Sequence, residues 1–225
     1  MNVAVIIPAL NEAVAIGGLV RRVPPGLVAE VVVVDNGSTD ATARVAAEAG
    51  ARVVSEPQRG YGAACWAGVA ALSDDTDVVA FFDGDGSQRP EELEGVLRPI
   101  LDGAADFVLG ARRLGARHPL HASLGTRLVA RFVAWRYGVR LSDLGPFRAI
   151  RVPLLTKLGM RDRASGWPVE MVVKAAALGA TIVEVDVTQA PRQGGRSKVS
   201  GTVRGSVRAA YGFLRAALGA ARDVP

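Results

Sequence analysis

Short, continuously apolar runs alternate with Ala-rich stretches of helical length, and this alternation constrains the fold more than any other feature. The first half predicts five strands and the four helices between them, the strands at 3–7, 30–35, 52–55, 77–82 and 107–110 and the helices at 13–23, 39–49, 62–72 and 90–101. Runs that are apolar throughout indicate strands buried on both faces, and crossover helices between them indicate parallel pairing. The predicted fold class is α/β, with a mostly parallel central sheet flanked by helices.

The pattern changes after residue 111. The second half predicts two further strands, three helices, a Gly- and Arg-rich loop and a last amphipathic helix, namely strands 147–151 and 181–187, helices 120–137, 153–158 and 169–177, loop 188–198 and helix 199–221. We find no internal repeat and no low-complexity linker. We therefore expect a single domain over 1–225, divided into halves at 1–110 and 111–198 and completed by the C-terminal segment 199–225.

The composition excludes several classes of protein. Hydrophobic residues make up 49% of the 225 residues, which is typical of a globular chain, and the net charge of +5 suits phosphate-bearing ligands or an anionic membrane surface. This excess is too small and too dispersed to predict a nucleic-acid partner. The single cysteine, Cys65, excludes a disulfide framework and a Cys-based zinc site. We see no signal peptide and no apolar run of about 18–20 residues, so the expected location is the cytoplasm, either free or at the inner face of the cell membrane.

Polar segments follow four of the predicted strands, where ligands bind in an open parallel sheet. They are Pro8-Ala9-Leu10-Asn11-Glu12, Asp35-Asn36-Gly37-Ser38-Thr39-Asp40, Arg59-Gly60-Tyr61-Gly62 and Asp83-Gly84-Asp85-Gly86-Ser87-Gln88. In extended backbone, residues two apart point the same way, so Asp83 and Asp85 can face one hard cation, with Gly84 allowing close approach. Mg²⁺ or Mn²⁺, completed by substrate phosphates, is the expected ion. The alternative for this segment by itself is a solvated acidic turn.

The other segments have functional and structural interpretations. A carboxylate at Asp35 suits a nucleobase or ribose, whereas Ser38 and Thr39 read as turn and N-cap residues. Asn11 and Glu12 either bind ligand or begin a helix. Arg59 and Gly60 supply a cation and a flexible loop before a helix start, which suits a diphosphate, the alternative being an ordinary glycine loop.

Two familiar nucleotide folds are excluded by the turn after the first strand, which carries neither a Gly-x-Gly-x-x-Gly pattern nor a P-loop. The set of motifs instead resembles glycosyltransferase family 2, with a GT-A fold, and in particular the dolichyl- and polyprenyl-phosphate sugar synthases. The resemblance covers about residues 3–215 and includes 110–112, 143–148, 167–171 and 192–198. One departure concerns the metal shell. Relatives often have Gln two positions after the second Asp, where this chain has Ser87, followed by Gln88.

The resemblance implies a nucleotide-sugar-binding half over 1–110 and an acceptor half over 111–198. It implies that Pro8, Ala9, Asn11, Glu12, Asp35, Asp83 and Asp85 bind the donor, and that Asp83 and Asp85 hold the metal, with Ser87 or Gln88 completing its shell. The residues themselves add Arg59, Gly60 and Gly84 on the donor side. On the acceptor side, the candidates for receiving a phosphate are Arg112, Arg127 and Arg131, and further candidates are Arg148 and Glu170. Arg192 and Lys198 would stabilise the leaving diphosphate. Asp143 would act as a base or a positioning group. Glu170 has the alternative of an ion pair with Arg192 or Arg148.

The implied reaction is inverting, metal-dependent transfer of a hexose from a UDP- or GDP-linked sugar to a polyprenyl phosphate at the cytoplasmic membrane face. The alternatives are the same donor chemistry with a soluble or saccharide acceptor, and a nucleotide-sugar-binding protein without catalysis. The helix predicted at 199–221 either lies on anionic lipid or packs against the domain. A membrane-anchored partner and the oligomeric state stay open.

Overall fold

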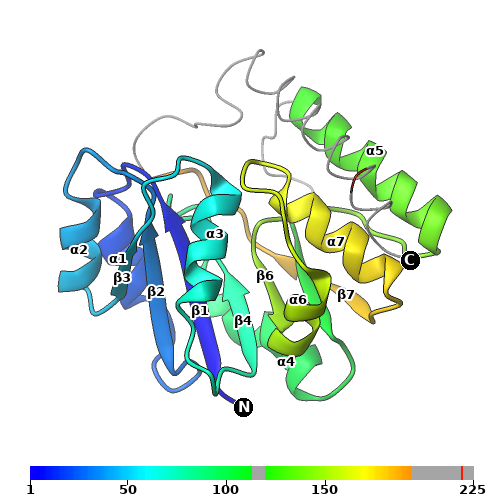
Figure 1. Ribbon diagram of the computed structural model, residues 1–225, viewed down its shortest axis with the longest axis horizontal. Helices are drawn as coiled ribbons and strands as arrows, with labels where there is room; N and C mark the ends of the chain where they lie inside the picture. Colours follow the sequence, from blue (N-terminus) through cyan, green and yellow to red (C-terminus); the bar gives the residue numbers. More distant parts are fainter. Residues whose placement is uncertain (113–119, 194–218, 220–225) are drawn as a thin grey trace.

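A seven-stranded sheet forms the centre of the computed structural model, which describes residues 1–112, 120–193 and 219 (Figure 1). The strand order is β3-β2-β1-β4-β6-β5-β7. The strands are β1 (Val3–Ala9), β2 (Glu30–Asp35), β3 (Arg52–Ser55), β4 (Val78–Phe81), β5 (Phe107–Arg112), β6 (Arg148–Arg151) and β7 (Ile182–Val187).

Six of the seven strands point the same way. β1 pairs in parallel with β2 and β4, β2 with β3, and β5 with β7, while β6 runs antiparallel between β4 and β5. The expected mostly parallel sheet is therefore confirmed. The carboxyl ends of β1 to β5 meet along one edge, and the polar segments that follow them meet there too.

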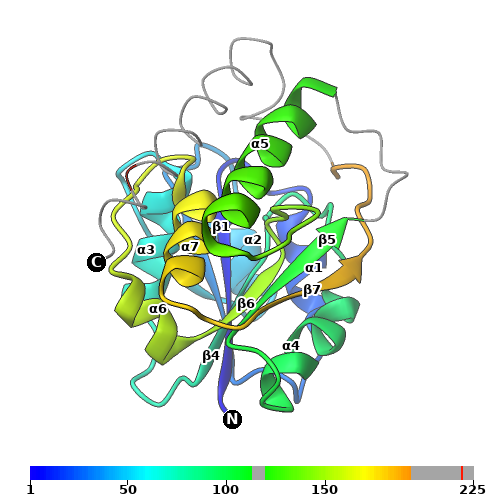
Figure 2. The same ribbon diagram turned by 90° about the vertical axis from the view of Figure 1, so that its right-hand side faces the viewer.

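Helices cover both faces of the sheet (Figures 1 and 2). One face buries α1 (Ile16–Arg21), α2 (Thr42–Glu48) and α4 (Leu93–Leu101), and the other buries α3 (Tyr61–Ala70), α6 (Val152–Leu158) and α7 (Trp167–Ala177). Helix α5 (Leu120–Tyr137) packs on α7, on the side away from the strands, as Figure 1 shows. The helix predicted at 199–221 lies outside the described residues.

Local chemistry explains where the helices depart from expectation. The helix predicted at 90–101 begins with a 3₁₀ turn, Pro90–Glu92, because proline at its first position favours a tight start. The helix predicted from residue 13 begins only at Ile16. Asn11 has a φ of 53°, a left-handed conformation, and therefore the chain is still turning at that point.

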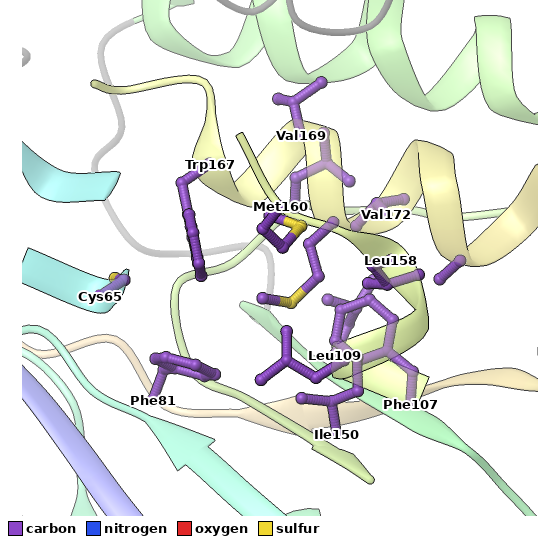
Figure 3. Close-up of a cluster of buried hydrophobic side chains, with 14 of the residues drawn as sticks. Cys65, Phe81, Phe107, Leu109, Ile150, Leu158, Met160, Trp167, Val169 and Val172 are labelled. Atoms are coloured by element: carbon purple, nitrogen blue, oxygen red, sulfur yellow. The ribbon is translucent and has the colours of Figure 1, made fainter. Parts of the chain in front are cut away.

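Three large buried aromatic side chains, Phe81, Phe107 and Trp167, belong to the cluster between the sheet and α7 (Figure 3). Trp167, at the start of α7, is 1% exposed and lies beside Phe81 of β4 in the same buried cluster. Its ring also makes an edge contact with Trp66 of α3, at a centroid distance of 6.4 Å. This packing holds the loop 159–166, which leads into α7, against the start of α3.

Candidate active site

The loops after β1 and β2 interlock through side-chain hydrogen bonds. The backbone N–H of Asn11 donates to Ser38 Oγ (2.9 Å), and Asn11 Oδ1 accepts from the backbone N–H of Thr39 (2.8 Å). Asn11 therefore joins the two loops. Asp35, at the end of β2, accepts the backbone N–H of Ser38 on Oδ1 at 3.1 Å and keeps its side chain partly exposed to a ligand. Pro8 and Ala9 line the same edge at the end of β1.

Asn36, which the sequence predicts only as a turn residue, is buried and connects the loop after β3 to the end of β2. Its Nδ2 donates to the carbonyl oxygens of Glu56 (3.0 Å) and Gln58 (2.7 Å), and its Oδ1 accepts the backbone N–H of Gly60 (2.8 Å). One amide thus fixes the loop after β3 to the end of β2. Because Asn is also a common turn residue, nothing in the local sequence distinguishes this role.

Asp83 and Asp85 lie on the loop after β4, close against the end of β1. A Cβ on Gly84 would lie 3.1 Å from the carbonyl oxygen of Pro8, so glycine suits this close approach. Asp83 Oδ1 is buried without a hydrogen-bond partner. Burial and the charge of Asp85 raise the pKa of Asp83 to about 7, although hydrogen bonding to the Tyr61 hydroxyl opposes the rise.

An orphaned carboxylate oxygen beside a second carboxylate fits a hard divalent cation, which would neutralise both charges. Over 1–112 and 120–193, no group of three or more His, Cys, Asp or Glu side chains could hold a metal ion. Oxygens of a bound diphosphate and water, with or without Ser87 or Gln88, would complete the shell.

Ser87 and Gln88 are both buried, and both support the metal loop. The backbone N–H of Ser87 donates to Asp85 Oδ1 (2.9 Å), and Gln88 Oε1 accepts the backbone N–H of Asp83 (2.7 Å). Gln88 Nε2 is buried without a partner. The arrangement makes Gln88 a brace for Asp83, and a third protein ligand stays a prediction.

Arg192 reaches the same loop from the segment after β7. Its Nη1 lies 3.2 Å from Asp85 Oδ2, and its Nη2 contacts Glu12 Oε1. The backbone N–H of Gln193 donates to the carbonyl oxygen of Asp85 (2.9 Å) and anchors the segment. The fold therefore brings the predicted Arg192 to the predicted metal loop, whereas Lys198 lies outside the described residues.

The start of α3 is used differently from the prediction. The backbone N–H groups of Gly62 and Ala63 donate to the carbonyl oxygens of Ala164 and Arg163, both at 2.9 Å. A Cβ on Gly60, which has a φ of 153°, would lie 2.1 Å from the Arg163 oxygen. The glycine is needed for this packing, which the sequence interpretation did not foresee, and the assignment of Gly60 to the diphosphate stays a prediction. Arg59 stays exposed, with Nε 3.2 Å from where a Cβ on Gly37 would lie, beside the turn that follows Asp35.

Arg112, the last residue of β5, forms a two-point ion pair with Asp143. Arg112 Nε and Nη2 lie 2.6 and 2.7 Å from Asp143 Oδ2 and Oδ1. Burial opposes the charge on Asp143, but the hydrogen bonds and the charge of Arg112 outweigh it and hold the Asp143 pKa below its ordinary value. Glu184 of β7 in turn accepts the backbone N–H groups of Ser142 (2.9 Å) and Asp143 (3.0 Å). Asp143 therefore suits positioning of Arg112 better than proton abstraction.

Two predicted acceptor residues are structural. Arg148 is 1% exposed, and its guanidinium donates to the carbonyl oxygens of Gly145 (2.5 Å), Pro168 (3.0 Å), Pro146 (3.4 Å) and Leu144 (3.5 Å), so it braces a loop and does not face an acceptor.

Glu170 is 4% exposed and pairs with Lys174 at 2.7 Å, not with Arg192 or Arg148. Its carboxylate also accepts the backbone N–H groups of Arg161 (2.8 Å) and Asp162 (2.7 Å). Glu170 thus fixes the loop that covers the start of α3. Arg131 is exposed on α5, and the side chain of Arg127 lies outside the described residues.

The positioning role of Asp143 leads to a test by pH. Asp143→Asn should lower transfer about tenfold, because Arg112 loses a charged partner, while the pH–rate profile keeps its shape, because this carboxylate does not titrate near neutral pH. The measurement is kcat/KM from about pH 5.5 to about pH 9 for both proteins. Arg112→Lys, which loses the two-point contact, should behave similarly. Loss of an acidic limb in Asp143→Asn would instead identify a base.

The sheet, its order and the loop carboxylates define the class of the protein. They are those of a GT-A glycosyltransferase, in which a mixed sheet presents nucleotide-binding loops at one edge. The chain belongs to glycosyl transferase family 2, whose family model matches residues 4–159. It is an enzyme of the glycosyltransferase class that binds a nucleotide sugar, as the resemblance implied.

Relatives of nearly the same length are known. An uncharacterised glycosyltransferase of Mycobacterium tuberculosis H37Rv is 44% identical over 95% of this chain and 96% of its own. The undecaprenyl-phosphate mannosyltransferase of Micrococcus luteus is 30% identical over 91% of this chain and 90% of its own.

Among solved structures, glucosyl-3-phosphoglycerate synthase of Mycobacterium tuberculosis, in complex with Mn²⁺, UDP and phosphoglyceric acid, superposes with a TM-score of 0.79. It is 27% identical, and the match covers 100% of this chain and 79% of that one. The same enzyme is also known with Mg²⁺ and UDP. Within the described part of the present chain, none of the helices has the length and apolar character needed to cross a bilayer.

Proposed function

We propose that this glycosyltransferase moves a hexose from a nucleoside-diphosphate sugar to a polyprenyl phosphate, with inversion, at the inner face of the cell membrane. The observation that carries the proposal is the convergence of Asp83, Asp85 and Arg192 at the edge of the sheet where Asp35 also ends its strand. Residues 1–110 supply the donor side and 111–198 the acceptor side. The donor base is uracil or guanine, since a carboxylate at Asp35 suits either.

The donor diphosphate is the part of the substrate that most needs stabilisation. Asp83 and Asp85 would hold Mg²⁺ or Mn²⁺, which supplies positive charge to the leaving diphosphate when bound. Pro8, Ala9 and Asp35 are placed to hold the nucleoside. Arg192 already lies at the metal loop and can place a second positive charge on the diphosphate. The metal-bound and UDP-bound structures of the mycobacterial relative support this assignment.

The acceptor side suits a phosphate better than an alcohol. Arg112 is held by Asp143 and lies close enough to Asp83 for the charge of that carboxylate to favour the protonated guanidinium and raise its pKa. A phosphate beside Arg112 would therefore lie near the donor. A phosphate monoester has a second pKa of about 6 and is mostly ionised at neutral pH. It attacks without losing a proton in that step, so the low pKa of Asp143 is no obstacle.

Two observations favour a lipid-linked phosphate. The undecaprenyl-phosphate mannosyltransferase of Micrococcus luteus matches almost all of both chains. In addition, Leu128 and Trp135 are 55% and 80% exposed on one face of α5, with Arg131 and Arg136 exposed beside them. Exposed indole and leucine next to arginine suit the interface of an anionic bilayer.

A soluble phosphorylated acid is the second candidate acceptor. The structural match to glucosyl-3-phosphoglycerate synthase covers the whole of this chain, and its complexes contain phosphoglyceric acid. Both candidates present a phosphate to the same arginine. They differ in what carries that phosphate and in the attacking group, because phosphoglyceric acid also offers a hydroxyl, which would have to lose a proton.

The test is transfer of labelled sugar by the purified chain with Mg²⁺ or Mn²⁺. UDP-glucose and GDP-mannose are each offered polyprenyl phosphate in vesicles or phosphoglycerate in solution. Label that enters the organic phase and is lost with a chelator supports the synthase and identifies the donor. Label confined to phosphoglycerate would overturn the polyprenyl-phosphate acceptor in favour of the soluble one. Donor binding without transfer or hydrolysis would favour a nucleotide-sugar-binding protein.

The exposed face of α5 gives a prediction specific to the lipid acceptor. The double change Leu128→Ser and Trp135→Ser should reduce transfer to polyprenyl phosphate in anionic vesicles about tenfold, because two apolar side chains no longer enter the interface. Donor hydrolysis should be unchanged. The matched control is Leu101→Ser with Leu178→Ser, two exposed leucines on α4 and after α7. Equal losses in both double variants would contradict a role for this face of α5.

A further inference from the structure

Arg192 joins two carboxylates that lie far apart in the sequence. One, Glu12, follows β1 and is 7% exposed, and the other, Asp85, follows β4. The side chains of Arg192 and Asp85 are about one-fifth exposed, at 21% and 18%. The guanidinium therefore lies between the two loops to which the proposed function assigns the nucleotide and the metal.

The charges around Arg192 explain why it lies there. Asp83 and Asp85 lie two residues apart on one loop, and the buried carboxylate of Glu12 adds a third negative charge at the same edge. Partly buried carboxylates are stable only with a compensating charge. A guanidinium supplies that charge and, with its several N–H donors, can bond two carboxylates at once.

We propose that Arg192 is an internal counter-ion that exchanges partners during the catalytic cycle. In the free protein it bonds Asp85 and Glu12. When a divalent cation and a nucleoside diphosphate enter, the cation takes over the charge of Asp85, and Arg192 turns from that carboxylate to the diphosphate. This inference rests on the proposed function, since it needs a divalent cation at Asp85. It adds a resting state in which the guanidinium of Arg192 takes the place of the cation beside Asp85.

The exchange has a thermodynamic signature. A metal that binds alone must displace Arg192 from Asp85 without giving it a new partner, so its affinity is reduced. A metal that binds together with UDP brings that new partner. UDP should therefore raise the affinity for Mn²⁺ more in the wild-type protein than in a variant that lacks the guanidinium, because the coupling between two ligands is a property of both sites.

The first experiment measures Mn²⁺ binding to the purified full chain without UDP, by electron paramagnetic resonance of the free ion. Arg192→Gln should bind Mn²⁺ about tenfold more tightly than wild type, as expected for loss of one competing charge-assisted contact. Removal of any nearby positive charge also favours a cation, so Arg89→Gln is the control. Arg89 is exposed on the same loop, one residue after Gln88. Equal gains in the two variants would overturn the proposal.

A double-variant cycle with Glu12→Gln separates partner exchange from a general field effect. If the two substitutions act independently through their charges alone, their fold-changes in Mn²⁺ affinity multiply. If Glu12 anchors Arg192 at the site, the tenfold gain from Arg192→Gln should shrink to about threefold or less when Glu12 is already Gln. Multiplicative behaviour of the two changes would overturn the proposal. Circular dichroism and the Tm of each variant verify that the compared proteins are folded.

The second experiment repeats the titrations with saturating UDP. The increase in Mn²⁺ affinity that UDP produces should be about tenfold larger in wild type than in Arg192→Gln. If wild type binds Mn²⁺ with UDP and hydrolyses a donor, but UDP has the same effect in both proteins, the exchange is wrong and the proposed function stands. If wild type binds no Mn²⁺ even with UDP, the metal-dependent function fails, and the exchange fails with it.

Discussion

Asp85→Asn should lower sugar transfer by roughly a thousandfold, because the metal stabilises the charge of the leaving diphosphate by several kcal/mol and an amide holds a divalent cation much less well than a carboxylate. The fold should survive the change. Asp85 lies in a loop with its side chain partly exposed, and an asparagine Oδ1 can still accept the backbone N–H of Ser87. The expected loss is therefore in catalysis and not in stability.

The measurement for Asp85→Asn is turnover at saturating donor and metal, together with the Tm of the variant. Asp102→Asn is the matched control, since Asp102 is exposed at the end of α4 and should leave both quantities unchanged. Turnover close to wild type in Asp85→Asn would refute the assignment of this carboxylate to the metal.

The second large effect should be on stability. Glu170→Gln removes the charge that compensates Lys174, which is buried at 2% exposure. Removal of one partner from a buried ion pair costs about 3–5 kcal/mol, because the remaining charge stays desolvated. We expect the lower end of that range, since Lys174 Nζ also donates to the carbonyl oxygen of Gly159 (2.9 Å). The loop 159–166, which covers the start of α3, should loosen with it.

Urea unfolding of Glu170→Gln measures this loss. Arg44 and Glu48 offer a matched exposed pair on α2, with the same i,i+4 spacing and the same 2.7 Å contact, and Glu48→Gln should change stability by only about 0.5 kcal/mol. Adding Lys174→Met to Glu170→Gln should restore part of the loss, because no uncompensated charge then remains. Equal losses for Glu170→Gln and Glu48→Gln would show that burial of the pair contributes nothing.

The secondary structure was largely predictable, because strand and helix patterns are local. The predicted strands at 30–35 and 52–55 and the predicted helix at 120–137 have the bounds of β2, β3 and α5. The antiparallel direction of β6 between β4 and β5 was not specified by any local pattern. Strand direction depends on which neighbours pair, and this is settled by the packing of the whole sheet.

The gathering of the polar segments at one edge was also predictable, because strand ends of a parallel sheet meet there and Asp83 and Asp85 are only two residues apart. The glycines before α3 show the limit of that reasoning. Gly60 looked like part of an anion-binding loop, but the carbonyl oxygen of Arg163 lies where its side chain would be. A backbone contact over a hundred residues away in the sequence leaves no local signal.

What the sequence by itself determined is therefore the class of fold and the edge of the sheet at which the carboxylates of Asp35, Asp83 and Asp85 lie, since each depends on periodicity or on residues close together in the chain. What only the tertiary structure decided is which charge meets which. Glu170 pairs with Lys174 and not with Arg192, Asp143 holds Arg112, and Arg192 reaches Asp85 and Glu12. Arginine and glutamate have the same charges wherever they lie, so their partners are chosen by distance and burial, and these exist only once the chain has folded.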